Sequence, residues 1–294
     1  MKTLTDKRKS FASRLRTGRT AWAAGAYDAL SARCIESAGF DAVFTTGFGI
    51  SAAQIGAPDV GLYTMSENLA AVRGIAGAVA APVIADGDTG YGNAINVMRT
   101  VREFEAAGVC GLTLEDQVSP KTCPVLAGKP LTVPIDEAAG KIRAAVAART
   151  DPDFLIIGRT DARDMDEALV RARAYADAGA DLIQPVGFSF AGLSELQTLR
   201  QTCGLPLSVM VAGWYNDIEP DAFEGLAGMV TFPLLALFSA TAAMQSNLAA
   251  VAGTRRLTAA PMATTSDESF SQLLGYPQLR EIEARFLPAK TETN

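Results

Sequence analysis

Short apolar runs alternate with helical patterns along most of this 294-residue chain. Runs that are apolar throughout are typical of strands buried on both faces, as in parallel sheets whose strands are joined by helices. Eight such units indicate an α/β fold, a (β/α)8 TIM barrel, with an open doubly wound sheet as the alternative. The eight runs lie at roughly residues 22–26, 41–46, 82–86, 111–116, 154–160, 181–186, 206–212 and 228–233.

Helix ends support the same alternation. Three expected helices end in Ala-Gly directly before an apolar run, at residues 38–39, 107–108 and 178–179. Glycine suits the left-handed position that ends a helix, and intervals of roughly seventy residues fit two βα units each. Thr64 and Asn93 stand where helix caps are expected.

Composition limits the classes of protein that the chain can be. Hydrophobic residues make up 49% of it, enough for one barrel domain, predicted over residues 1–260. The alternation degrades after about residue 253, so we expect 261–294 to be a helical extension for contacts between subunits. The formal net charge of −6 argues against nucleic-acid or membrane-surface partners. The most apolar long stretch, 229–252, is interrupted by Pro233 and polar residues, which argues against a membrane span.

The N-terminus and the cysteines bear on localisation. The first nineteen residues are basic but lack the apolar core of a secretory signal, so we expect a solvated first helix. The four cysteines are scattered, without metal-ligand or redox spacing. Both observations predict a reduced, cytoplasmic protein. Cys34 and Cys110 fall on helix and strand patterns and are expected in the core.

The chain contains no histidine, which excludes serine–histidine and cysteine–histidine dyads and histidine-ligated zinc. Chemistry must therefore use carboxylates, Lys, Arg, Tyr, Cys or a bound cation. The apolar run 82–85 ends in Asp86 and Asp88, followed by a glycine-rich turn. Two such carboxylates at a strand end favour a shared cation, and oxygen ligands suit Mg²⁺ or Mn²⁺, although Asp is also common in plain turns.

Two later strand ends carry charged residues as well. Leu114 is followed by Glu115 and Asp116, and the run 154–158 is followed by Arg159. The carboxyl ends of barrel strands meet at one face, where active sites of this fold lie. We therefore expect these side chains to converge with the aspartates.

These motifs resemble the isocitrate lyase/phosphoenolpyruvate mutase superfamily, in the branch of methylisocitrate lyase, dimethylmalate lyase and carboxyphosphonoenolpyruvate mutase. The resemblance is carried by Asp86-Gly-Asp-Thr-Gly-Tyr-Gly-Asn93, Leu114-Glu-Asp-Gln117, Pro120-Lys-Thr-Cys123 and Arg159-Thr-Asp-Ala162. It implies a Mg²⁺-dependent barrel, often assembled as a homotetramer (a dimer of dimers) whose last helix is exchanged between subunits.

The resemblance also implies roles for individual residues. Asp86 would bind Mg²⁺ directly, while three further acids would hold its waters, namely Asp59, Asp88 and Glu115. Arg159 would bind a substrate carboxylate, and the backbone N–H groups of Thr46, Gly47 and Phe48 would grip a 2-oxo acid. The metal would stabilise the enolate formed when a bond to the adjacent carbon breaks.

Cys123 stands where the lyase branch has its catalytic cysteine, which would protonate the enolate. Lys121, two residues earlier, would lower the pKa of that thiol, whereas an inert, buried cysteine is the alternative. Pro124-Val125 replaces the usual Gly-His, and Val186 and Met210 stand near positions where lyases carry polar groups. These departures predict a substrate smaller or more apolar than isocitrate.

The leading hypothesis is an enzyme, a C–C lyase that cleaves a small 2-hydroxy di-acid through a metal-stabilised enolate of a 2-oxo acid. Oxaloacetate decarboxylation or hydrolysis is the second hypothesis, favoured by Val186 and Met210, whereas Cys123 favours the lyase. Phosphonopyruvate-type C–P chemistry is the third. A non-catalytic ligand-binding barrel is disfavoured by the intact acids and Arg159. The expected partner in each case is a small carboxylic acid.

Overall fold

The computed structural model describes residues 3–17, 19–122 and 130–287. The chain forms two compact units, Met1–Leu237 and Phe238–Asn294. The first unit contains the sheet and the second is helical, and each is described by itself.

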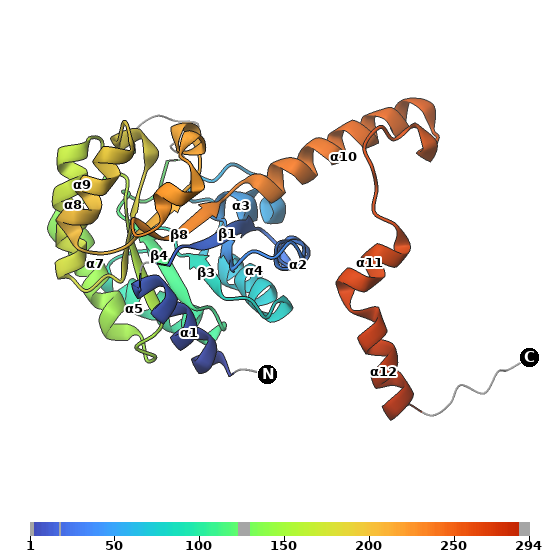
Figure 1. Cartoon of the computed structure of the whole chain (residues 1–294), viewed down its shortest axis with the longest axis horizontal. Helices are drawn as coiled ribbons and strands as arrows, with labels where there is room; N and C mark the ends of the chain where they lie inside the picture. Colours follow the sequence, from blue (N-terminus) through green and yellow to red (C-terminus); the bar gives the residue numbers. More distant parts are fainter. Residues whose placement is uncertain (1–2, 18, 123–129, 288–294) are drawn as a thin grey trace, which may run out of the picture. The chain divides into compact units, whose positions relative to one another are not determined.

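Eight parallel strands close into a barrel in the order of the sequence, with β1 paired to β8, so the predicted (β/α)8 fold is confirmed (Figure 1). Their register brings Glu115 beside Arg159 and Asp86 beside Thr113 at the carboxyl ends of neighbouring strands. Each strand matches one apolar run of the sequence to within a few residues: β1 Ala21–Ala26, β2 Ala42–Thr45, β3 Val83–Asp86, β4 Gly111–Glu115, β5 Leu155–Thr160, β6 Leu182–Pro185, β7 Leu207–Met210 and β8 Ala227–Phe232.

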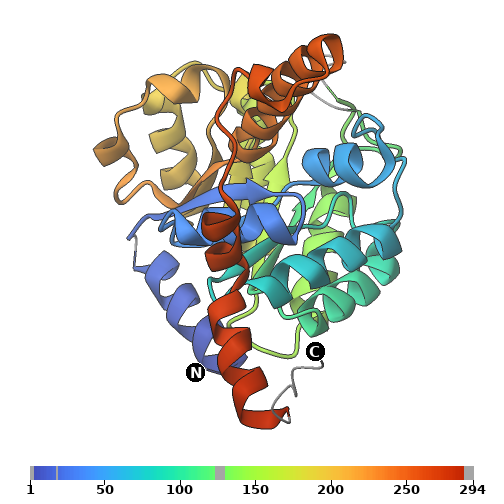
Figure 2. The ribbon, with the colours of Figure 1, turned by 90° about the vertical axis from the view of Figure 1, so that its right-hand side faces the viewer.

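Helices surround this sheet on its outer side (Figure 2). Short 3₁₀ turns follow β6 and β7, η1 at Gly187–Ser189 and η2 at Gly213–Asp217, and a third, η3, covers Pro220–Phe223. The α-helices of this unit are α1 Leu4–Arg16, α2 Ala29–Ser37, α3 Gly47–Ile55, α4 Met65–Ala78, α5 Ala94–Ala106, α7 Ile135–Ala148, α8 Met165–Asp177 and α9 Leu193–Cys203.

The three Ala-Gly helix ends are confirmed. They close α2, α5 and α8, where Gly39, Gly108 and Gly179 all have positive φ. These helices follow β1, β3 and β5, which is the expected interval of two βα units. Thr64 forms a capping box with Glu67, and Asn93 caps α5 as predicted.

The first helix differs from its sequence-based prediction, because one face of α1 is buried rather than solvated. Phe11 and Leu15 belong to a cluster with Ile84 and Leu155, from strands β3 and β5. Arg8 is buried beside them and donates to the carbonyl of Val109. Burial of the apolar side chains of α1 against the barrel is more favourable than the burial of Arg8 is costly, because Arg8 finds hydrogen-bond acceptors there.

Cys34 was expected in the core, but its side chain is exposed on α2. Cys110 is buried before β4, as expected. The helical pattern at Cys34 was real, but the residue lies off the apolar stripe that faces the sheet.

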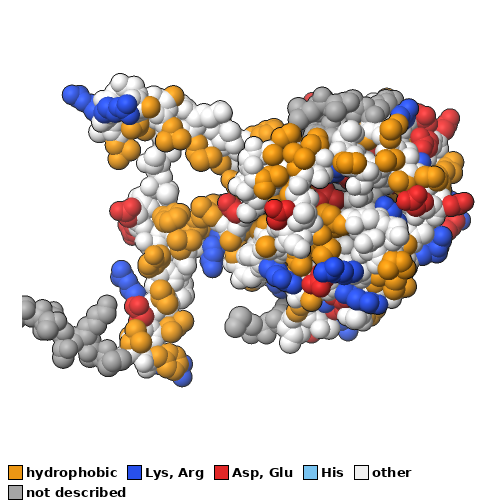
Figure 3. Space-filling view, turned by 180° about the vertical axis from the view of Figure 1, so that it is seen from behind, with side chains coloured by type: hydrophobic (Ala, Val, Ile, Leu, Met, Phe, Trp, Pro, Cys, Tyr) orange, Lys and Arg blue, Asp and Glu red, His pale blue; other side chains and the backbone are white. Residues whose placement is uncertain are grey.

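The second unit contains most of α10 (Leu235–Thr254), the 3₁₀ turn η4 (Leu257–Ala259), α11 (Asp267–Leu274) and α12 (Tyr276–Phe286). No residue of these elements is buried. By length and composition alone, α10 is long and apolar enough to cross a membrane, in contrast to the expectation for 229–252, although it carries Gln245, Ser246 and Asn247. Hydrophobic side chains lie exposed along the unit (Figure 3), including Phe238, Met244, Leu248, Phe270, Leu279, Ile282 and Phe286.

Candidate active site

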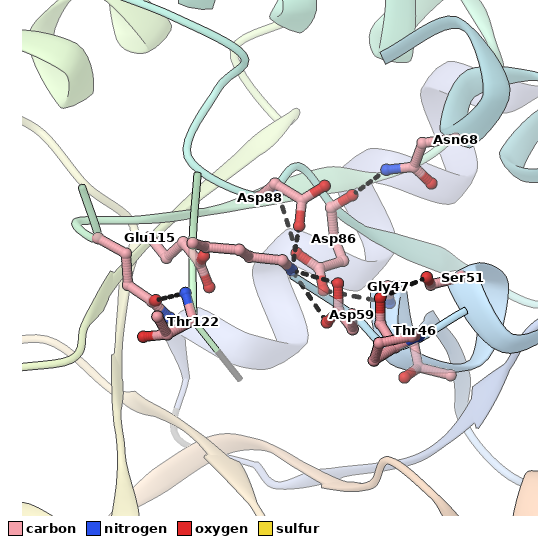
Figure 4. Close-up of polar contacts among 12 residues, drawn as sticks. Thr46, Gly47, Ser51, Asp59, Asn68, Asp86, Asp88, Glu115 and Thr122 are labelled. Atoms are coloured by element: carbon pink, nitrogen blue, oxygen red, sulfur yellow. Dashed lines mark hydrogen bonds and ion pairs between the residues drawn. The ribbon is translucent and has the colours of Figure 1, made fainter. Parts of the chain in front are cut away.

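The predicted acids meet at the carboxyl end of the barrel. Asp86 ends β3, Glu115 ends β4, and Asp88 lies in the turn after β3 with a φ of 49°. Asp59 comes from the segment between α3 and α4. All four carboxylates are buried and are gathered in one place (Figure 4). The predicted convergence of Asp86, Asp88 and Glu115 is therefore borne out by their positions, while their roles stay predictions. Asp116 does not join them, because its carboxylate accepts from the N–H of Asp161 and the hydroxyl of Tyr175 and pairs with Arg171.

Two backbone N–H donors and one hydroxyl acceptor hold Asp86 in place. Its Oδ2 accepts from the N–H of Gly47 at 3.2 Å and its Oδ1 from the N–H of Asp88 at 3.0 Å. Its own N–H donates to Oγ1 of Thr45 at 3.0 Å. A Cβ on Gly47 would lie 2.8 Å from Oδ2 of Asp86 and 2.6 Å from the hydroxyl of Tyr63. Any residue larger than glycine at position 47 would therefore displace the Asp86 carboxylate or the Tyr63 hydroxyl.

Lys121 lies among these acids. Its Nζ is 2.9 Å from Oδ1 of Asp59 and also forms an ion pair with Asp88. Burial by itself would lower the pKa of Lys121, but the surrounding carboxylates raise it well above its usual value. The side chain is therefore an ammonium ion bound by two acids, a position that its spacing from Cys123 did not predict. Cys123, Pro124 and Val125 lie outside the described residues.

Arg159 is the second cation of the site. Its Nη1 lies 2.9 Å from Oε2 of Glu115, and its Nη2 donates to Oδ1 of Asp161 at 2.7 Å. Its Nε is buried without a hydrogen-bond partner among the described residues. The guanidinium thus keeps unused donor capacity while it lines the adjoining cavity.

Among the described residues, the acids of the site exceed the positive charge beside them. Four carboxylates (Asp59, Asp86, Asp88 and Glu115) face two cations, and Asp161 shares one of these. Burial, with the charge of Asp88 added, raises the pKa of Asp86 to about 6. Burial also raises the pKa of Glu115 to about 8, although Arg159 opposes that shift. Oε1 of Glu115 has no hydrogen-bond partner within the described part of the chain.

These features fit a divalent cation. Uncompensated, buried oxygen ligands are the donor set that Mg²⁺ and Mn²⁺ prefer. Within residues 3–17, 19–122 and 130–287, no three acidic or cysteine side chains stand close enough to hold a metal by themselves. Mg²⁺ usually keeps several waters and takes one or two carboxylates directly, so this spacing agrees with one direct ligand and acids that hold waters.

The loop expected to grip a substrate begins α3. The N–H of Thr46 donates to the carbonyl of Ala26, and that of Gly47 to Asp86. The Thr46 hydroxyl caps α3 by accepting from Gly49. The backbone donors of Thr46 and Gly47 are therefore engaged within the chain, and the predicted grip on a 2-oxo acid by Thr46, Gly47 and Phe48 stays a prediction.

A cavity of about 440 Å³ adjoins the acids. Trp214 in η2 donates through Nε1 to the carbonyl of Gly187 in η1 at 2.9 Å, which ties the two loops of the far wall together. Gln184, buried on β6, accepts from Ser208 and adds an amide. Polar lining comes from Thr46, Asp59, Asp86, Arg159 and Gln184, and apolar lining includes Phe48, Val186, Phe188, Met210, Trp214, Pro233 and Leu234.

Sequence reasoning missed several residues of the site, including Asn68, Tyr91, Gln184 and Trp214. Gln184 had a usable signal, since it is a polar residue inside an apolar run. Asn68 had none, because an asparagine in a helix is ordinarily exposed, whereas here it is fully buried against the turn after β3.

Comparison with known proteins agrees with this geometry. The family model of phosphoenolpyruvate phosphomutase matches residues 11–252. The chain belongs to the isocitrate lyase/phosphoenolpyruvate mutase superfamily. It is 42% identical to 2,3-dimethylmalate lyase of Eubacterium barkeri, over 92% of this chain and 95% of that protein.

Other members of the superfamily act differently. An oxaloacetate decarboxylase of a Bradyrhizobium species is 40% identical over 62% of each chain. A phosphonopyruvate hydrolase, solved with oxalate and Mg²⁺, superposes with a TM-score of 0.86 at 33% identity, covering 96% of this chain and 99% of that one. The chain is therefore an enzyme of the lyase and mutase type, and its substrate has to be argued from the site.

Proposed function

We propose that the protein is a Mg²⁺- or Mn²⁺-dependent lyase that cleaves the C2–C3 bond of an alkyl-substituted 2-hydroxy di-acid such as 2,3-dimethylmalate. The observation that carries this proposal is the apolar wall of the cavity beside the acids. Among the described residues that line it, Arg159 is the only cation, while Val186, Phe188 and Met210 face it with apolar groups. Burial of an alkyl substituent against this wall is favourable, whereas the third carboxylate of isocitrate would be buried without a partner. Val186 and Met210 also suit oxaloacetate, but oxaloacetate has no alkyl substituent to cover the wall.

Asp86 would hold the cation, with Asp59, Asp88 and Glu115 holding its waters. A bound divalent cation would supply a Lewis acid for the carboxylate and the C2 oxygen of the substrate. Arg159, which lies on β5 beside Glu115 of β4, would bind a substrate carboxylate. Because Arg159 is already anchored by Glu115 and Asp161, it would be oriented before the substrate arrives.

Cleavage of the C2–C3 bond removes one proton from the substrate and returns one proton to the departing acid. The C2 hydroxyl loses its proton to a base, the C2–C3 electron pair moves to C3, and C2 becomes the carbonyl of a 2-oxo acid. C3 is then the enolate carbon of the departing acid and takes up one proton. The enolate therefore belongs to the departing acid, and the enolate of a 2-oxo acid expected from the sequence arises instead in decarboxylation of oxaloacetate.

Cys123 is the proposed donor of the proton to C3. In that case Cys123→Ser should keep substrate binding and lose several orders of magnitude in kcat, because a hydroxyl is far less acidic than a thiol. Cys34→Ser, at an exposed cysteine on α2, is the matched control and should leave kcat unchanged. A fully active Cys123→Ser variant would instead support decarboxylation or C–P chemistry.

A substrate panel tests the function directly. The full-length enzyme with Mg²⁺ is offered 2,3-dimethylmalate, 2-methylisocitrate, isocitrate, oxaloacetate and phosphonopyruvate, while pyruvate, glyoxylate, CO₂ and phosphate are followed. We expect pyruvate from 2,3-dimethylmalate, and no turnover after chelation of the metal. Release of CO₂ from oxaloacetate alone would favour the second candidate, which the 40% identity to an oxaloacetate decarboxylase supports. Release of phosphate alone would favour C–P chemistry.

The helical unit 238–294 is proposed to mediate a homotetramer by exchange of a C-terminal helix between subunits, in a cytoplasmic enzyme without nucleic-acid or membrane partners. Its exposed side chains, such as Leu279, Ile282 and Phe286, form apolar faces that a second copy of this chain would cover. Truncation at Ala260 should reduce the mass measured by light scattering. An unchanged mass would contradict the exchange.

A further inference from the structure

The turn that carries Asp88 is held by polar side chains from three surrounding helices. Thr100 of α5 donates to the carbonyl of Gly90 at 3.2 Å, and Lys141 of α7 donates to that of Thr89 at 3.2 Å. Asn68 of α4 donates to the carbonyl of Asp86 at 2.9 Å (Figure 4). Of these three side chains, Asn68 is the one whose contacts continue to the carboxylate of Asp88.

The contacts of Asn68 have a defined direction. Its Nδ2 donates one proton to the Asp86 carbonyl and the other to the hydroxyl of Tyr91, at 2.7 Å. The reverse orientation of the amide would place two acceptors, Oδ1 and the Asp86 carbonyl, against each other. Because the Tyr91 oxygen accepts from Asn68, its single proton is available for Oδ2 of Asp88, at 2.8 Å.

This chain of hydrogen bonds gives the two carboxylate oxygens of Asp88 different partners. Oδ2 is occupied by Tyr91, and Oδ1 is the oxygen that contacts the ammonium of Lys121 among the acids. Asp88 and Tyr91 both have left-handed backbone conformations, with φ of 49° and 58°. Residues other than glycine keep such conformations when the surrounding contacts determine them, as these do.

We infer that Asn68 and Tyr91 are positioning residues of the metal site, which orient Asp88 so that Oδ1 faces the point where the acids converge. The inference rests on the proposed metal-dependent function. Neither residue touches the cavity that would hold the substrate, so their effect is on the cation and its waters rather than on substrate contacts. Groups that orient metal ligands in this way typically change metal affinity when they are removed.

The test is Mn²⁺ binding to the full-length protein, measured by calorimetry without substrate. Tyr91→Phe removes one oxygen and Asn68→Ala removes the amide, and each should weaken Mn²⁺ binding about 10- to 100-fold. The double variant should be no weaker than the worse single variant, because both changes break the same chain of contacts. Thr100→Val is the matched control, since it removes a buried hydrogen bond to the same turn without contact to an acid, and should bind Mn²⁺ like the wild type.

Tyr91→Phe with wild-type affinity would overturn the inference while leaving the proposed function intact. Equal losses in Tyr91→Phe and Thr100→Val would also overturn it, because they would show general loosening of the turn. A wild-type protein that binds no Mn²⁺ would overturn the metal-dependent function and this inference together. Thermal melting of each variant shows whether it is folded, and Tyr91→Phe, which changes least, keeps the test decisive if Asn68→Ala does not fold.

Discussion

Buried charges occur at both ends of the barrel, but they are balanced at one end and not at the other. Before β4 and β5, Arg8 donates to the carbonyls of Val109 and Glu105 and forms an ion pair with Asp151. The Glu105 carboxylate accepts from the N–H and hydroxyl of Thr150 and from the N–H of Asp151. Every buried donor and acceptor of this cluster has a partner, as expected of a structural network.

After β3 and β4, the acids outnumber the cations that the described part of the chain places beside them. Glu115 keeps an oxygen without a hydrogen-bond partner among the described residues, and burial raises its pKa and that of Asp86. Burial of charge is thus common to both ends and does not by itself mark function. The uncompensated negative charge is what distinguishes the candidate site, because a protein gains nothing for folding by leaving it unpaired.

Asp86→Ala, at the end of the barrel with excess acids, should have the largest effect on metal binding and turnover. Removal of the proposed direct ligand should reduce Mg²⁺ binding below detection and abolish turnover, while the metal-free protein stays folded. The physical reason is that removing a buried carboxylate without enough positive charge offsets the loss of the hydrogen bonds from the N–H groups of Gly47 and Asp88. Calorimetric Mg²⁺ titration and thermal melting check both parts, with exposed Asp177→Ala as the control. Unchanged Mg²⁺ affinity would remove the central claim.

Glu105→Ala should have the opposite effect. It removes the carboxylate that pairs with Arg8 and accepts hydrogen bonds from Thr150 and Asp151. We therefore expect a loss of about 3–5 kcal/mol in the free energy of unfolding. Mg²⁺ affinity of the folded fraction should not change. Glu103→Ala, two residues earlier in α5 and in an exposed ion pair with Arg73, should cost less than about 1 kcal/mol. Similar losses in urea unfolding for both variants would contradict the view that the Arg8 cluster is a structural network.

Arg159→Lys tests a residue that is paired with acids but retains free donors. An ammonium keeps the charge but cannot form two parallel hydrogen bonds with a carboxylate, so KM should rise about 10- to 100-fold. Steady-state kinetics with the best substrate of the panel measure this, with exposed Arg173→Lys as the control. Wild-type kinetics would show that Arg159 is structural, like Arg8.

The pH dependence of stability should be the smallest effect. The folded-state pKa values of Asp86 and Glu115, about 6 and about 8, lie above their unfolded values, so the folded protein binds more protons. Stability of the metal-free protein should therefore fall as the pH rises from about 4 to about 8. Between pH 6 and pH 8, where mainly Glu115 still loses its proton, the fall should be roughly 1 kcal/mol per pH unit. Mg²⁺ should weaken this dependence by favouring the ionised carboxylates, and Glu115→Gln should reduce it. Urea unfolding with EDTA or Mg²⁺ at pH 6, 7 and 8 measures it, and a flat profile with EDTA would contradict it.

Local sequence patterns were sufficient to predict the barrel and three of the four acids of the candidate site. Alternation of apolar runs and helices depends on neighbouring residues, and parallel strands bring their carboxyl ends together wherever they occur. This is why the convergence of Asp86, Asp88 and Glu115 could be predicted from positions in the sequence. The expectation for α1 failed because its apolar face is covered by strands that are distant in the sequence.

The sequence by itself determined the fold class, the positions of the acids at the strand ends and, through the absence of histidine, the kinds of chemistry that remain. Only the tertiary structure decided that Lys121 lies between Asp59 and Asp88, and that Asn68 holds the turn of Asp88 through Tyr91. The physical reason is that strand ends follow from periodicity, which is local. Which side chain pairs with which acid depends instead on the closure of the barrel, which places residues from separate loops and helices within hydrogen-bond distance.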